Sequence, residues 1–267
     1  AEVQQADYII LESTYGNKRH DLSFAHVKTL NQWIQKTCVD KGGKLIIPAF
    51  SVGRTQEVLY TLNQLELEHR LPELNYFIDS PLSLKATEVI KKYREHFNER
   101  LQQVLKIDTD PFSFKGLKYI ESVEDSRKLV GYTEPCVVIS ASGTADAGRV
   151  RHHIRSCIDG AQNSILMVGY CSNTSLGGQL INGEKEVELF GESCSVEAVI
   201  GQFAGMSAHG DYDDLCRFIS NQDTDIVKKV FLVHGEYTVQ KEFATKLENK
   251  GFECIEIPKQ NEEFELL

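Results

Sequence analysis

The sequence predicts an α/β protein built around a parallel sheet. Short apolar runs of the kind found in buried strands alternate, along almost the whole chain, with longer segments whose apolar side chains recur at helical spacing. Turn-forming residues such as Gly42 and Gly43 separate the two kinds of segment. The chain has 267 residues, enough for one large domain or two ordinary ones, and its 41% hydrophobic content excludes a disordered or collagen-like protein.

The first half of the chain contains clear strand and helix patterns. The predicted elements are, in order, a strand at 8–11, a helix at 24–39, a strand at 44–48, a helix at 54–68, a strand at 76–78 and one long amphipathic helix at 83–105. Residues 106–118 contain Pro111 and have no clear period, so they predict a connector.

The second half continues the alternation. Its predicted elements are strands at 136–140, 164–168, 196–202 and 229–233, and helices at 148–157, 213–220 and 239–250. The tail, residues 258–267, predicts a short strand at most. The glycine-rich stretch 201–210 is the best candidate for a domain boundary.

The charge balance argues against broad, non-specific binding to nucleic acid. Lys and Arg number 29 against 39 Asp and Glu, which gives a net charge of −10. A local basic groove remains open, and residues 149–155 hold three arginines, although such a cluster is equally well a solvated face. Seven cysteines without a CxxC motif predict reduced thiols and a cytoplasmic protein. The apolar runs are far shorter than the roughly 18 residues of a membrane span.

Three polar residues stand where strands of the predicted sheet end. Glu12 follows the first strand, His234 follows the strand at 229–233, and His209 lies among small residues. Functional residues of α/β sheets gather just beyond the carboxyl ends of strands. Each one alone is more often a helix cap, an ion pair or a hydrogen-bonded structural histidine. On the residues alone, a functional site and a structural role stay equally open.

Three turns that link a strand to a helix carry hydroxyl, acidic and basic residues. They are residues 50–57, which include Arg54; Asp79-Ser80-Pro81; and Ser140-Ala141-Ser142-Gly143, which precedes Arg149. Such turns hold phosphate through backbone N–H groups and hydroxyls, but the same residues are ordinary turn formers. On one parallel sheet, all three would face the same edge. No nucleotide-binding glycine motif and no serine-hydrolase elbow occurs, and the neighbouring His152 and His153 make a poor chelating pair.

Taken in order, five motifs resemble the β-CASP family of metallo-β-lactamase-fold nucleases. The motifs are Ile9–Gly16, Pro48–Glu57, Asp79–Leu82, Ser207–Asp211 and Leu232–Glu236, with further likeness at 140–149 and Gly169-Tyr170. The resemblance implies a β-CASP domain, a parallel sheet with helices on both faces, plus the C-terminal portion of a metallo-β-lactamase αββα fold. It places the boundaries at residues 1–16 and 201–267 for the lactamase segments and 17–200 for the β-CASP domain.

The resemblance also implies the chemistry of hydrolysis with two zinc ions. His234 corresponds to a zinc ligand of the family, while Glu12 and His209 correspond to catalytic residues. We expect Glu12 to hydrogen-bond and orient His209, which would contact the phosphate or protonate the leaving oxygen. Family members that act on RNA carry histidine at the position of His234, and those that act on DNA usually carry valine. RNA is therefore the implied substrate, and a DNA-repair nuclease is disfavoured.

The chain departs from the family pattern in two places. It contains no HxHxDH motif. We therefore expect this chain to be the C-terminal part of a longer protein whose N-terminal lactamase half is missing from the chain. With His234 as the single family ligand, we expect no stoichiometric zinc and no RNA hydrolysis by this chain, because a catalytic zinc takes about three protein ligands. The turn Thr174-Ser175-Leu176-Gly177-Gly178 lacks the basic residue that relatives commonly carry.

The predicted function is that of a ribonuclease of RNA processing or decay, endonucleolytic, 5′-exonucleolytic or both, with this chain as its substrate-clamping part. A non-catalytic RNA-binding or scaffold subunit is the alternative, and a homodimer is left open. The predicted substrate groove is lined by Arg54, Ser140, Ser142, Gly143 and Arg149. Removing Arg149 should then reduce the salt dependence of RNA binding by about one phosphate contact.

Overall fold

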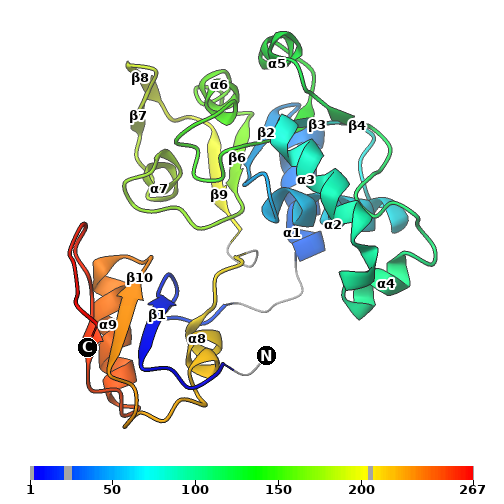
Figure 1. Cartoon of the computed structure of the whole chain (residues 1–267). Coiled ribbons are helices and arrows are strands. Elements are labelled where there is room, and N and C mark those ends of the chain that lie inside the picture. Colours follow the sequence, from blue (N-terminus) through cyan, green and yellow to red (C-terminus); the bar gives the residue numbers. More distant parts are fainter. Residues whose placement is uncertain (1–2, 21–25, 204–206, 267) are drawn as a thin grey trace. The chain divides into compact units, whose positions relative to one another are not determined.

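The structure, a computed structural model, describes residues 3–20, 26–203 and 207–266 (Figure 1). It divides into two compact units. The terminal unit comprises residues 1–21 and 207–267, and the central unit comprises residues 22–206. The division lies a few residues beyond each boundary expected from the sequence.

The central unit contains a six-stranded parallel sheet with the strand order β4-β3-β5-β2-β6-β9. Its strands are β2 (Lys44–Pro48), β3 (Asn75–Asp79), β4 (Leu117–Tyr119), β5 (Cys136–Ser140), β6 (Ser164–Met167) and β9 (Val199–Gln202). Parallel strands are covered on both faces and so consist of continuous apolar runs. The central strand β5, with every residue buried, follows this rule.

Helices cover both faces of this sheet (Figure 1). Leu45 and Ile47 of β2 pack against one set of helices, whereas Ile46 between them packs against the other, because successive strand side chains point to opposite faces. The first set is α1 (His26–Ile34), α2 (Arg54–Leu67) and α3 (Pro81–Lys92); the second is α5 (Val123–Val130), α6 (Val150–Arg155) and α7 (Leu176–Ile181). The predicted α/β class with helices on both faces is confirmed.

Some predicted elements of the central unit differ from the observed ones. The single helix expected at 83–105 is wrong: α3 ends at Lys92, a 3-10 turn spans Arg94–His96, and α4 spans Glu99–Val104. The side chain of Asn98 accepts a hydrogen bond from the N–H of Leu101 and so begins a new helix. The helix expected at 24–39 is α1 followed by a π-helical segment, Gln35–Asp40, and residues 24–25 lie outside the described residues.

Other elements of the central unit were not predicted at all. They are β4, which begins inside the connector expected at 106–118, α5, α7 and the antiparallel hairpin of β7 (Glu186–Leu189) and β8 (Glu192–Ser195). In addition, β9 pairs with β6 of the central sheet, so the strand crosses the boundary expected at residue 200.

The terminal unit contains a three-stranded parallel sheet with the order β1-β10-β11. Its elements are β1 (Tyr8–Glu12), α8 (Tyr212–Phe218), β10 (Lys229–Val233), α9 (Tyr237–Glu248) and β11 (Ile255–Glu256). One face of the sheet, with Leu11 and Leu232, packs against Leu215 of α8 and Phe243 of α9. The tail after β11 contains no strand within residues 258–266. Among the described helices, none combines the length and apolar character that a membrane span requires.

Candidate functional site

Glu12 and His209 form a hydrogen-bonded pair at the end of β1. The Nδ1 atom of His209 lies 2.9 Å from Oε2 of Glu12, as the sequence analysis expected. The other carboxylate oxygen accepts a hydrogen bond from the backbone N–H of Gly210 at 3.0 Å. Because Nδ1 is occupied by the carboxylate, Nε2 is the ring nitrogen of His209 through which it would contact a substrate or a metal.

The environment of Glu12 keeps its carboxylate ionised. Partial burial raises its pKa, but hydrogen bonds from Thr14 and Gly210 and the nearby His209 outweigh burial, so the pKa of Glu12 is lowered. The side chain is 27% exposed and that of His209 is 37% exposed. The carboxylate is therefore ionised, and the pair is oriented and partly open to solvent.

His234 emerges beside this pair because β1 and β10 are parallel neighbours. Glu12 is paired in register with Val233, the residue before His234, so both side chains leave the same edge of the sheet. The ring centroids of His209 and His234 lie 4.8 Å apart. His234 has a backbone φ of 51°, which is uncommon for a residue other than glycine and is typical of constrained functional sites.

Thr14 holds both the backbone and the ring of His234. Its hydroxyl donates to the backbone carbonyl of His234 at 2.9 Å, and the same oxygen lies 2.9 Å from His234 Nδ1. Because Nδ1 lies against Thr14, Nε2 is the ring nitrogen that would bind a metal as neutral imidazole.

The three residues meet the requirements of a cation site in part. Ligand atoms of Glu12, His209 and His234 all lie within 4.8 Å of one another. Two imidazoles and a carboxylate are a donor set that zinc accepts, and a catalytic zinc takes about three protein ligands. The sequence analysis counted His234 alone, whereas the structure offers three donors. A cation would, however, compete with the existing bond between Glu12 and His209.

A second set of residues supports this cluster and was not predicted. The Nε2 atom of His20 lies 2.7 Å from the carbonyl oxygen of His209. Asp211 accepts from the N–H of His20 and caps α8 by accepting from Asp214. An aspartate before an amphipathic segment is a recognisable helix start, but the contact with His20 has no counterpart in local sequence.

In the central unit, the three polar turns share one edge of the sheet, as expected. Pro48 and Asp79, the last residues of β2 and β3, are both paired in register with Ser140, the last residue of β5. Ser140 is buried and donates to the carbonyl of Asp79 at 2.8 Å. Ser142 follows, and its hydroxyl accepts from the N–H of Ala147.

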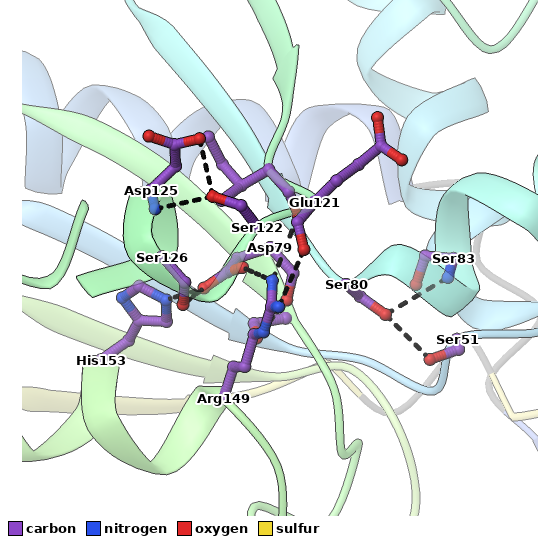
Figure 2. Close-up of polar contacts among 12 residues, drawn as sticks. Ser51, Asp79, Ser80, Ser83, Glu121, Ser122, Asp125, Ser126, Arg149 and His153 are labelled. Atoms are coloured by element: carbon purple, nitrogen blue, oxygen red, sulfur yellow. Dashed lines mark hydrogen bonds and ion pairs between the residues drawn. The ribbon is translucent and has the colours of Figure 1, made fainter. Parts of the chain in front are cut away.

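Arg149 is tied to a buried carboxylate (Figure 2). Its Nη1 atom donates to Oδ1 of Asp79 at 2.8 Å and to the carbonyl of Ile120, and its Nη2 atom donates to the carbonyl of Glu121. Arg54 is buried and forms an ion pair with Glu57. Both arginines of the predicted groove therefore already have acidic partners, which the sequence analysis did not foresee. Their contact with substrate stays a prediction.

Asp79 is the centre of a buried polar network. Figure 2 shows His153, Ser126 and Arg149 converging on its carboxylate, with His153 Nε2 at 2.7 Å and the hydroxyl of Ser126 at 2.6 Å. Burial raises the pKa of Asp79, but hydrogen bonds from His153, Ser126 and Arg149 outweigh it, so the pKa is lowered. The sequence analysis treated Asp79 as a turn residue and missed this role.

The neighbouring histidines of α6 have separate environments. The ring of His152 stacks on Phe190 at a centroid distance of 4.6 Å, whereas His153 is buried against Asp79. The prediction that the two make a poor chelating pair is confirmed. Neither belongs to the group of Glu12, His209 and His234.

These observations define a protein with a parallel α/β unit and a second unit that carries an acid–histidine–histidine cluster. Two family models match the chain: the Beta-Casp domain over residues 55–180 and the Zn-dependent metallo-hydrolase RNA specificity domain over residues 193–257. The chain belongs to the β-CASP family of metallo-β-lactamase-fold nucleases.

Similar proteins come from bacteria, archaea and plants. Ribonuclease TTHA0252 of Thermus thermophilus is 31% identical over 86% of this chain and 52% of its own length. An RNase J-like protein of Methanocaldococcus jannaschii is 29% identical over 91% of this chain and 55% of its own length. Cleavage and polyadenylation specificity factor subunit 3-I of Arabidopsis thaliana is 29% identical, with coverages of 90% and 34%. The chain thus spans about half, or less, of these relatives.

Proposed function

We propose that this chain is the substrate-clamping C-terminal part of a zinc-dependent ribonuclease of RNA processing or decay. The observation that carries the proposal is the hydrogen-bonded Glu12–His209 pair beside His234, with ligand atoms of all three residues within 4.8 Å of one another. A matched domain named for RNA specificity and relatives named as ribonucleases support RNA as the substrate. The cysteines, all free thiols, support a cytoplasmic location.

Each residue of the cluster has a separate task in this proposal. His234 would hold zinc through Nε2, together with ligands supplied by an HxHxDH segment. When bound, zinc supplies a nucleophile near neutral pH and positive charge against the scissile phosphate. Glu12 fixes the ring of His209 through Nδ1, so that Nε2 of His209 contacts the phosphate or gives a proton to the leaving oxygen.

The test uses a protein that joins this chain to an HxHxDH segment. His209→Ala should reduce single-turnover cleavage of a labelled RNA by about 10²- to 10⁴-fold, the usual contribution of a general acid or base, while RNA affinity changes little. His152→Ala, which alters an exposed histidine of the central unit, is the matched control and should cleave normally. Full cleavage by His209→Ala would overturn the catalytic role and favour the scaffold alternative.

A further inference from the structure

Phe50 presents a half-exposed aromatic ring at the edge where the polar turns gather. It lies two residues after the end of β2 and is 47% exposed. Its backbone is anchored, since its carbonyl accepts from both the N–H and the hydroxyl of Thr55, at 3.1 and 2.8 Å. The ring is therefore presented by a fixed backbone at the start of α2, as a preorganised binding surface requires.

Gly143 holds the ring from one side. A Cβ atom at Gly143 would lie 2.7 Å from Cδ2 and 2.9 Å from Cε2 of Phe50, so the ring packs directly against glycine backbone. This close approach explains why glycine stands in the turn after β5. The rest of the ring has no aromatic or cationic partner among the residues that the structure describes.

Phe190 has nearly the same exposure as Phe50, but its ring already has partners within the chain. It is 49% exposed at the tip of the β7–β8 hairpin. His152 stacks on its ring, and the guanidinium carbon of Arg151 lies 4.7 Å from its centroid. Phe190 is thus engaged by neighbours from its own unit, and Phe50 is the ring of the two that remains available.

The surroundings of Phe50 favour recognition by stacking and hydroxyl groups over recognition by charge. The two cations of the predicted groove, Arg54 and Arg149, are paired with Glu57 and Asp79. Hydroxyl groups line the turns, and the oxygens of Ser51 and Ser80 lie 3.1 Å apart (Figure 2). Nucleobases stack on aromatic rings whatever their identity, so a single-stranded nucleic acid fits this chemistry better than an isolated phosphate does.

We infer that Phe50 is a base-stacking platform on which one nucleobase of a single-stranded RNA lies, with Gly143 as its positioning residue. The inference deepens the proposed function and rests on it. Because the contact is uncharged, its contribution to RNA affinity should be the same at low and at high salt.

Fluorescence anisotropy of the full chain with a labelled single-stranded RNA provides the first test. Phe50→Ala should weaken binding by about 5- to 150-fold, the range that alanine substitution gives for one stacked base. Phe50→Tyr should retain affinity, and Phe190→Ala is the matched control that should leave it unchanged. Replacing the stacked nucleotide by an abasic one should weaken binding to the unaltered chain and make Phe50→Ala harmless.

Tryptophan fluorescence provides a second readout that does not depend on affinity. The chain has a single tryptophan, Trp33, so Phe50→Trp adds one emitter at the proposed platform. RNA should quench Phe50→Trp well beyond the change seen in the unaltered chain. If the unaltered chain does not bind RNA, both the proposed substrate-clamping function and the proposed stacking role of Phe50 are overturned. If it binds RNA, yet Phe50→Ala binds equally well and Phe50→Trp is not quenched, only the platform is overturned.

Discussion

Two carboxylates at strand ends, Glu12 and Asp79, accept a hydrogen bond from a histidine in nearly the same way. The distances are 2.9 Å to His209 and 2.7 Å to His153. The environments differ: Glu12 and His209 are partly exposed, whereas the side chains of Asp79 and His153 are 0% and 2% exposed. The same acid–histidine pair can thus serve chemistry or structure, and access to solvent separates the two.

The remaining partners of each carboxylate extend this contrast. Asp79 also accepts hydrogen bonds from Ser126 and Arg149, so one buried network links the end of β3 to α5 and α6. Glu12 is completed by backbone N–H groups, which orient the carboxylate without closing the site. We therefore propose a structural role for the Asp79 network and a catalytic role for the cluster of Glu12, His209 and His234.

The largest expected effect on stability comes from Asp79→Asn. The substitution leaves Arg149 beside a group that no longer balances its charge, and breaking a buried ion pair costs about 3–5 kcal/mol. Urea denaturation should show this loss in the free energy of unfolding. Asp110→Asn, in the partly exposed ion pair with Lys91, is the control and should cost about 1 kcal/mol or less. A loss for Asp79→Asn no larger than that of the control would contradict the structural role.

A smaller effect on stability is expected for Glu12→Gln. The pair is partly exposed, so the free energy of unfolding should change by about 1 kcal/mol or less. In a protein that joins this chain to an HxHxDH segment, cleavage should fall by roughly 10- to 100-fold, because the ring of His209 loses its orienting carboxylate. If Glu12→Gln lost as much free energy of unfolding as Asp79→Asn and still cleaved RNA normally, the proposed difference in role between Glu12 and Asp79 would be wrong.

The contribution of Asp79 to stability should depend on pH in a defined direction. Its pKa is lowered in the folded chain, so the stabilisation is complete above the ordinary aspartate pKa of about 3.9 and is lost as the pH falls through the lower folded value. The free energies of unfolding of the unaltered chain and of Asp79→Asn should therefore differ more above a pH of about 3.9 than below it, and should converge as the pH falls through the folded pKa of Asp79. A difference that grew toward acid pH would show that the carboxylate is protonated when folded.

The smallest expected effect is that of Arg149→Gln on the salt dependence of RNA binding. The sequence analysis predicted the loss of about one phosphate contact. Because Asp79 already neutralises the guanidinium, we now expect a slope change well below the roughly 0.7 that one single-strand phosphate contributes. Affinity titrations at several salt concentrations measure it. A full change of about 0.7 would show that Arg149 turns from Asp79 toward the substrate.

The strands of the fold could be predicted because a buried strand appears in the sequence as a short run of apolar residues. The strands at 44–48, 136–140 and 229–233 have the predicted bounds. The first two are continuous apolar runs, as expected for strands of a sheet that helices cover on both faces. The helix at 83–105 could not be predicted as two helices, because apolar spacing continues across the cap at Asn98. Helical spacing of apolar residues does not indicate that one helix ends and another begins inside the periodic segment.

The candidate sites depend on contacts that local sequence does not contain. Glu12 and His209 are 197 residues apart, and only the resemblance of ordered motifs paired them in advance. Asp79 and Arg149 are 70 residues apart and meet because β3 lies beside β5. The order of strands in a parallel sheet is set by crossover connections between distant segments. The residues next to Glu12 or Asp79 in the sequence therefore do not identify His209 or Arg149 as the partner.

Cleavage measured per folded molecule, for His209→Ala beside His153→Ala in a protein that joins this chain to an HxHxDH segment, tests the separation of roles most directly. The account predicts that His209→Ala keeps its stability and loses about 10²- to 10⁴-fold in cleavage. His153→Ala should lose stability, while its folded fraction cleaves at nearly the normal rate. The opposite pattern, with cleavage lost at His153 and retained at His209, would contradict the assignment of the working site to Glu12, His209 and His234.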